Sequence, residues 1–159
     1  MTLSLGVVVA IRFLLVALFL PFSALDKILN FRGAVAQAMQ VVPAEGPATV
    51  LILAGLAIEI VMPLAILSGI GDRVAAVILA GYCGVTALLW KPFWRPGDFW
   101  RSGKSEARDL FWDFLKNFSL AGGFLLITFG TTVGAVGHLI AHPAPTTHPY
   151  TVQVTHERR

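Results

Sequence analysis

The chain has 159 residues, of which 56% are hydrophobic and only 13% are charged. Soluble domains carry about 25% charged residues, so this composition argues against a soluble domain and favours a membrane protein. The net charge of +3 gives no reason to expect nucleic-acid binding, and the single cysteine, Cys83, excludes an intramolecular disulfide or a self-contained dithiol relay.

Four apolar stretches follow one another along the chain, and each is close to the length of about 20 residues that crosses a bilayer as a helix. They cover residues 3–25, 48–70, 74–90 and 114–137. We therefore expect an all-α fold in which residues 1–142 form a bundle of four transmembrane helices. Residues 143–159 are mostly polar and contain three prolines, so they are expected to form a flexible tail.

Lysine and arginine residues concentrate in the connections after the first and the third stretch. These connections and their edges contain Lys27, Arg32, Lys91, Arg95, Arg101, Lys104, Arg108 and Lys116, whereas the opposite side has Arg73, Arg158 and Arg159. Loops rich in lysine and arginine tend to stay in the cytoplasm during membrane insertion. The pattern predicts that both basic connections face the cytoplasm and that both termini face the periplasm or the exterior.

The first two stretches each contain a charged residue well inside the membrane. Glu59 is the only charge between residues 47 and 71, and such a charge costs about 2.5–3.5 kcal/mol on insertion unless it is paired. Helical rise places Arg12 and Glu59 about 13 Å and about 16 Å from the same membrane surface, so the two side chains are expected to pair.

Tyr82 and Cys83 fall at a similar depth on the third stretch. Together with Arg12 and Glu59 they are the predicted intramembrane polar site. Two interpretations stay open: an ion pair that only fixes how the helices pack, or a polar pocket that binds a ligand or relays a proton.

A second group of polar residues is expected at the cytoplasmic rim. It consists of Asp26, Lys27, Asn30, Lys116 and Asn117, which end the first stretch and begin the fourth. These side chains either form one polar cluster or simply extend to the lipid head groups.

Further along the chain, three features allow weaker predictions. The connection over residues 91–113 is rich in aromatic residues and is either an anchor in the membrane interface or a docking surface for a partner. Gly130 and Gly134 form a GxxxG pair that favours tight helix packing or dimerisation. His138 and His142 lack further ligands nearby, so no metal site is predicted.

Motifs on three of the four helices, spread over about residues 10–127, contain Arg12, Phe19, Ser23, Lys27, Asn30, Phe31, Glu59, Gly69, Arg73, Ala75, Ala76, Lys116, Asn117, Gly122 and Gly123. This set resembles the motifs of the DoxX family of small bacterial membrane proteins. Ala24 and the run Val61-Met62-Pro63 depart from the family pattern, in which glycines are usual at both places.

The resemblance implies a four-helix protein of the bacterial inner membrane that is linked to quinone and thiol redox systems. It suggests an accessory or anchor subunit with a protein partner, and a quinone or other small apolar ligand near Arg12 and Glu59. The chain carries no redox motif of its own, which argues against self-sufficient electron transfer. The alternatives are a stand-alone membrane enzyme that uses Glu59 as a base with Tyr82 or Cys83, or a small-molecule carrier that acts as a dimer.

Overall fold

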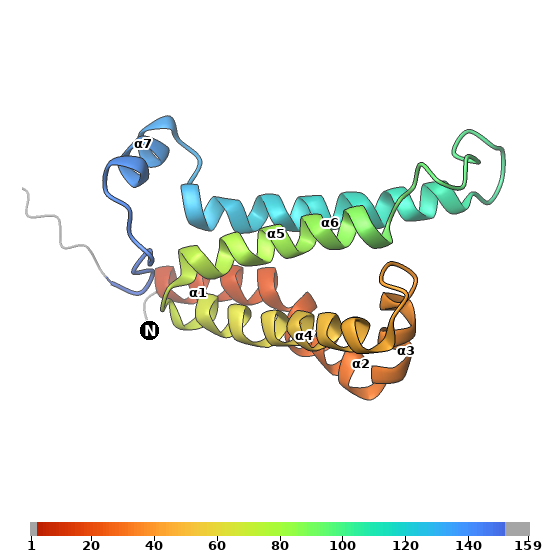
Figure 1. Cartoon of the computed structure of the whole chain (residues 1–159). Coiled ribbons are helices and arrows are strands. Elements are labelled where there is room, and N and C mark those ends of the chain that lie inside the picture. The colour runs from red at the N-terminus through yellow and green to blue at the C-terminus, as the bar shows by residue number, and fades with distance from the viewer. Residues whose placement is uncertain (1–2, 152–159) are drawn as a thin grey trace, which may run out of the picture.

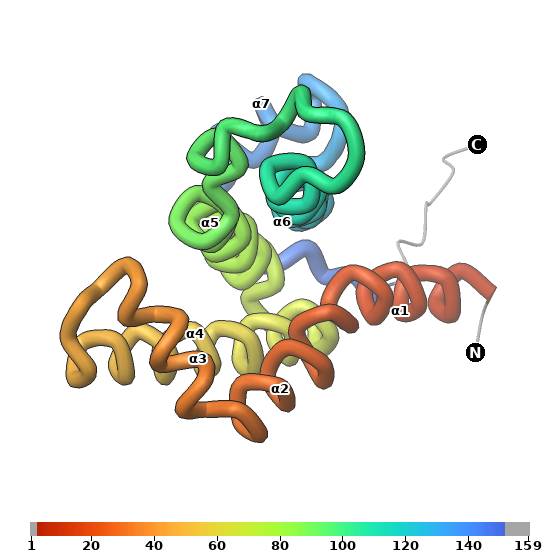
Figure 2. Tube along the Cα trace, turned by 90° about the vertical axis from the view of Figure 1, so that its right-hand side faces the viewer, coloured from red at the N-terminus to blue at the C-terminus, as the bar shows by residue number. Residues whose placement is uncertain are grey.

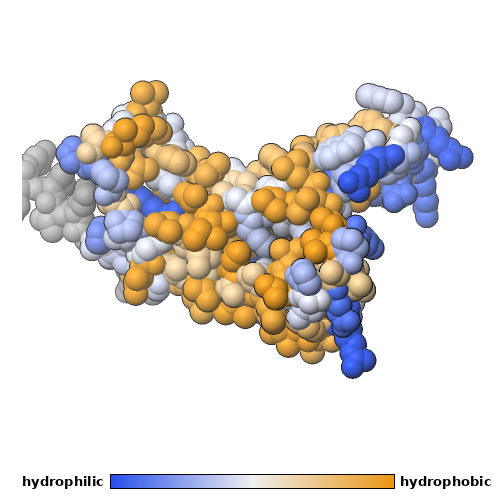
Figure 3. Space-filling model, viewed as in Figure 1, coloured by the Kyte–Doolittle hydropathy of each residue, from blue (hydrophilic) through white to orange (hydrophobic). Residues whose placement is uncertain are grey.

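A computed structural model describes residues 3–151 and is helical, with no strand in that part of the chain (Figure 1). Four of its helices are long and apolar enough to cross a membrane, namely Leu3–Leu29, Glu45–Ser68, Asp72–Trp90 and Glu106–Phe129. Apolar side chains cover the middle of the molecule, and hydrophilic ones gather toward its two ends (Figure 3). The predicted all-α fold with four membrane spans is thus confirmed.

The first span is broken into three pieces. Helix α1 (Leu3–Val16) is followed by a π-helical turn, η1 (Leu18–Ser23), and by α2 (Ala24–Leu29). The break falls at Pro21, which has no backbone N–H to donate, and Leu20 leaves helical geometry with φ −118° and ψ 110°. The span therefore ends at Leu29 rather than at residue 25, and its second half runs in a new direction.

A short helix then folds back against the second span. Helix α3 (Phe31–Ala38) packs Val35 and Ala38 on Ala48 of α4 (Glu45–Ser68). It lies at the same end of the molecule as the connection over residues 91–105 (Figure 1). We call this end the α3 end, and it carries both of the basic connections.

The second and third spans meet in a tight turn at the opposite end. Gly69 ends α4 in the left-handed region, with φ +75°, and α5 (Asp72–Trp90) starts almost at once. Seen from the α3 end, α5 and α6 (Glu106–Phe129) appear nearly end-on, while α1 and α4 run across the view (Figure 2). The two pairs of helices therefore meet near the turn and diverge toward the α3 end.

The buried core lies where these pairs meet. Its largest fully buried apolar side chains are Phe124, Ile66, Leu79 and Val16, one from each of the four spans. Small residues of α5, among them Ala75 and Ala76, let the neighbouring helices approach closely.

The fourth span differs from its predicted bounds at both ends. It begins at Glu106, where the Ser105 hydroxyl caps the helix by accepting a hydrogen bond from the Arg108 N–H. It ends at Phe129, because Gly130 takes φ +72° and turns the chain into a separate helix, α7 (Val133–Ala141). Gly130 and Gly134 thus do not share a helix face, and the expected GxxxG contact on this span is wrong.

Residues 144–150 pack against the end that carries α7, where a flexible tail was expected. The Thr146 hydroxyl donates to the Gly69 carbonyl, the Arg73 N–H donates to the Pro145 carbonyl, and the Tyr150 hydroxyl donates to the Leu67 carbonyl. These bonds satisfy backbone groups at the turn between α4 and α5, which gives the segment a fixed course. Residues 152–159 of the predicted tail lie outside the described residues.

Candidate functional site

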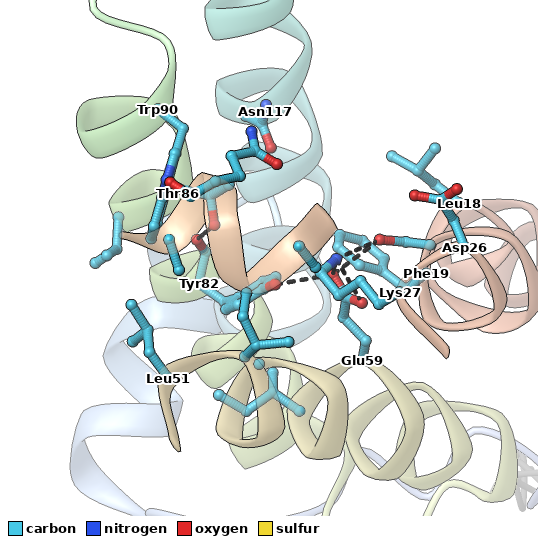
Figure 4. Close-up of a pocket in the computed structure, with 18 of the residues that line it drawn as sticks. Leu18, Phe19, Asp26, Lys27, Leu51, Glu59, Tyr82, Thr86, Trp90 and Asn117 are labelled. Carbon is cyan, nitrogen blue, oxygen red and sulfur yellow. Dashed lines mark hydrogen bonds and ion pairs between the residues drawn. The ribbon is translucent and has the colours of Figure 1, made fainter. Parts of the chain in front are cut away.

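A cavity of about 910 Å³ lies between the diverging pairs of helices, lined by residues of η1, α2, α3, α4, α5 and α6. Its walls are mostly apolar and include Leu18, Phe22, Leu51, Ile52, Ile78 and Val85. It runs from Glu59 in the interior to a mouth at the α3 end, where Lys91, Asp113 and Lys116 lie. Figure 4 shows Glu59 of α4 and Tyr82, Thr86 and Trp90 of α5 around this space.

Glu59 forms the floor of the cavity and is almost completely buried, with 2% of its surface exposed. Lys27 Nζ lies 2.7 Å from its Oε1 and 2.9 Å from its Oε2. The hydroxyls of Ser23 and Tyr82 donate to the same Oε1 at 2.9 Å and 2.8 Å (Figure 4). Lys27 thus neutralises the buried charge of Glu59, and two hydroxyls add hydrogen bonds to it.

Local sequence spacing explains this arrangement. Ser23 and Lys27 are four residues apart, so they lie on one face where η1 passes into α2, and Lys27 also donates to Ser23 at 2.9 Å. On α4, Gly55 stands one turn before Glu59 and leaves room for the Tyr82 ring, because a Cβ there would lie 3.2 Å from Tyr82 Oη. The floor therefore brings three spans together at one point.

Arg12 does not pair with Glu59, and this expectation is wrong. Its guanidinium forms a salt bridge of 2.7 Å with Asp72 and donates to the Ile66 carbonyl and to Thr147 Oγ1. Arg12 of α1 lies beside Ile66, two turns along α4 from Glu59, so the two charges do not share a level of the bundle. Asp72, at the start of α5, is fully buried and meets Arg12 there.

Cys83 also lies apart from the cavity. It is fully buried in the core between the spans, and its neighbour Tyr82 lines the cavity instead. Of the four residues predicted to form an intramembrane site, the structure brings together Glu59 and Tyr82 and leaves Arg12 and Cys83 elsewhere.

The predicted rim cluster is present in part. Asp26, Lys27, Lys116 and Asn117 all line the cavity, but Lys27 turns inward to Glu59 instead of toward the head groups. Asn30 is exposed at the end of α2 and is not among the lining residues. At the mouth, Asp113 Oδ2 lies 2.8 Å from Lys91 Nζ, and Asp113 Oδ1 lies 3.1 Å from Lys116 Nζ.

Several residues of the site were not predicted as members of it. Ser23 could have been found from its i, i+4 spacing to Lys27, whereas Thr86, Trp90 and Asp113 carry no signal beyond their polarity. Within residues 3–151, no three His, Cys, Asp or Glu side chains come together as metal ligands. His138 and His142 face each other with ring centroids 5.1 Å apart, away from the cavity.

Comparison with known proteins adds the family. The DoxX family model matches residues 7–92, which is more than half of the chain and includes Ser23, Lys27, Glu59 and Tyr82. The chain belongs to the DoxX family. No curated protein and no solved structure matches it. In this DoxX protein the matched region supplies the cavity floor, whereas the α6 side of the mouth lies beyond it.

Proposed function

We propose that this DoxX protein is an accessory membrane subunit of a redox system and holds a small amphipathic molecule, of the quinone class, in the Glu59 cavity. The observation that carries the ligand part is the cavity itself. Ligand pockets typically enclose about 300–1,000 Å³, with mostly apolar walls and a few convergent polar groups. Apolar walls that end at Glu59, Lys27 and Tyr82 fit that description. The redox part comes from the DoxX resemblance.

The state of Glu59 favours binding over catalysis by this chain alone. The stand-alone enzyme would use Glu59 as a base and would need Tyr82 or Cys83 to assist it on the substrate. The Tyr82 hydroxyl already donates to Glu59, and Cys83 lies outside the cavity. Both features speak against the stand-alone enzyme and in favour of a subunit that positions a ligand for a partner.

A surface for that protein partner is proposed on the connection over residues 91–105. It extends past the end of α5 (Figure 1) and presents Trp100 with 92% of its surface exposed. The Arg108 side chain donates to the carbonyls of Phe99, Arg101 and Gly103, which fixes the shape of the connection. A preformed loop with an exposed tryptophan is typical of an interaction surface.

The orientation is part of the same proposal. Both basic connections lie at the α3 end, so we place that end in the cytoplasm and both termini at the outer face of a bacterial inner membrane. The cavity mouth and the partner surface then face the same compartment, which would let a cytoplasmic partner reach the ligand.

Tryptophan fluorescence tests the proposed site. Trp90 lines the cavity, whereas Trp94, Trp100 and Trp112 do not, so a variant with these three replaced by phenylalanine reports on the cavity alone. A short-tailed quinone should quench Trp90 saturably in this variant. Ala54→Phe, which fills the cavity from α4, should raise the half-saturating concentration at least about tenfold. Ala57→Phe, exposed on the same helix outside the cavity, is the control. Equal quenching in both variants would contradict the proposal.

A further inference from the structure

Hydrogen-bond donors and acceptors at the cavity floor are unequally used, and this bears on the ligand. We propose that the floor selects a ligand whose inner polar group is a hydrogen-bond donor, namely a phenolic or alcoholic hydroxyl, and disfavours a group that only accepts. This inference rests on the proposed function and names the chemical class of the ligand. Applied to quinones, it means that the hydroquinone form binds more tightly than the oxidised form.

The hydroxyl donors of the floor are already engaged. The Ser23 and Tyr82 hydroxyls donate to Glu59 Oε1, and the Thr86 hydroxyl donates to the Tyr82 carbonyl at 2.7 Å. Lys27 directs one N–H at Ser23 Oγ and one at the Glu59 carboxylate, whose two oxygens lie too close together to take separate N–H groups. Among the described residues, the floor therefore keeps at most one hydrogen, the third N–H of Lys27, for a ligand carbonyl.

Acceptors remain open at the same place. Glu59 Oε1 accepts from Ser23 and Tyr82 and shares a Lys27 N–H with Oε2, which has no other donor among the described residues. A carboxylate oxygen accepts two hydrogen bonds, so Oε2 keeps one lone pair. Thr86 Oγ1 donates once and accepts from no described residue. A ligand hydroxyl can donate to Glu59 Oε2 or to Thr86 Oγ1, whereas a carbonyl would find at most the one remaining N–H of Lys27.

The mouth of the cavity has the opposite character, which fixes the direction of the ligand. Each of the two ammonium groups there, of Lys91 and Lys116, has three N–H groups and one oxygen of Asp113 as its side-chain partner. The Asn117 amide donates one N–H to the Asp113 carbonyl, and no described residue accepts its second N–H. A hydrogen-bond acceptor on the ligand can therefore bind these N–H groups at the mouth, which orients the ligand hydroxyl toward the floor.

A matched pair of ligands tests this directly. Para-decylphenol and its methyl ether share ring and tail, but the ether has lost the donor. Binding to the purified protein in neutral detergent is measured by equilibrium dialysis, with Ala54→Phe giving the background that is not due to the cavity. The phenol should bind at least about tenfold more tightly than the ether, since a buried polar group without a partner carries a penalty of that order.

The outcomes separate this inference from the proposed function. If both compounds bind in the cavity with equal affinity, or the ether binds better, the donor rule is overturned and the cavity proposal stands. If neither binds above the Ala54→Phe background, the proposed function fails and takes the inference with it. A phenol preference that survives in the Ala57→Phe control supports both.

Two variants at the floor locate the preference. Glu59→Gln brings amide donors to the floor, so the phenol and the ether should bind almost equally. Tyr82→Phe removes a donor that Glu59 already uses and frees an acceptor, so the phenol preference should persist. A preference that vanishes in Tyr82→Phe would overturn the assignment of the acceptor to Glu59. If Glu59→Gln fails to fold, Tyr82→Phe and the ligand pair still decide.

Discussion

Two buried ion pairs sit at different levels of the bundle and differ in what surrounds them. Arg12 and Asp72 meet near the α7 end, where residues 144–150 cover them and Thr147 bonds to both side chains. Lys27 and Glu59 meet further inside, at the floor of the large cavity. The Arg12–Asp72 pair is thus covered by other residues, whereas the Lys27–Glu59 pair faces the cavity and is accessible to a ligand. For this reason the ligand is proposed at the pair that adjoins a cavity and not at the covered pair.

The largest expected loss of stability follows from disruption of the covered Arg12–Asp72 pair. Asp72→Asn leaves the Arg12 guanidinium buried without its charged partner, and removal of one member of a buried pair costs about 3–5 kcal/mol. Thermal unfolding in detergent should show a large loss of stability, whereas ligand affinity per folded molecule should not change. Asp109→Asn, at an exposed position of α6, is the matched control. A loss of ligand affinity in folded Asp72→Asn would contradict the separation of the two pairs.

Disruption of the Lys27–Glu59 pair should lower both the stability of the protein and its affinity for the ligand. Lys27 is 20% exposed, and Ser23 and Tyr82 still hold Glu59 without it, so Lys27→Met should cost less than Asp72→Asn, about 1–3 kcal/mol. Ligand affinity should fall at least about tenfold, because the carboxylate is no longer held in place at the floor. Lys116→Met, with the side chain 71% exposed at the mouth, should change stability little. Unchanged affinity in Lys27→Met would argue that the floor does not bind the ligand.

The smallest change in stability is expected for a substitution in the connection over residues 91–105. Backbone N–H groups of Ala107 and Glu106 donate to Asp98, which holds the pKa of its carboxyl below the usual range. This contribution to stability is present above about pH 3.9 and is lost as the pH falls through the lowered pKa of the folded state. Thermal unfolding of wild type and Asp98→Asn should therefore differ at pH 6 and converge at strongly acidic pH. A constant difference across that range would show that Asp98 does not cap α6.

The sequence was sufficient to predict the four spans, because bilayer thickness and apolar length constrain each other closely. It predicted Glu59 and Tyr82 as site residues but gave Glu59 the wrong partner. Helical rise gives the depth of a backbone position and says nothing of helix rotation or of side-chain direction. Asp72 was overlooked because it lies in a turn, where a charge is usually solvated.

Two local breaks account for most of the remaining differences. At Pro21 the first span changes direction, which carries Lys27 inward to Glu59 although its sequence position suggests the head groups. At Gly130 the fourth span ends before its apolar stretch does, which separates α7 from α6. Both breaks occur at residue types, proline and glycine, that can be recognised in the sequence as helix breakers. The direction of the chain after each break, however, depends on packing with distant residues.

Native mass spectrometry of the protein, purified in a mild detergent from cells in which it is expressed, tests the central claim most directly. The account predicts a stoichiometric small molecule on wild type and on Ala57→Phe, and its loss from Ala54→Phe, with fragmentation identifying a hydroxyl-bearing amphipathic compound. A bare protein, or the same molecule retained by Ala54→Phe, would contradict the claim that the Glu59 cavity is a ligand site.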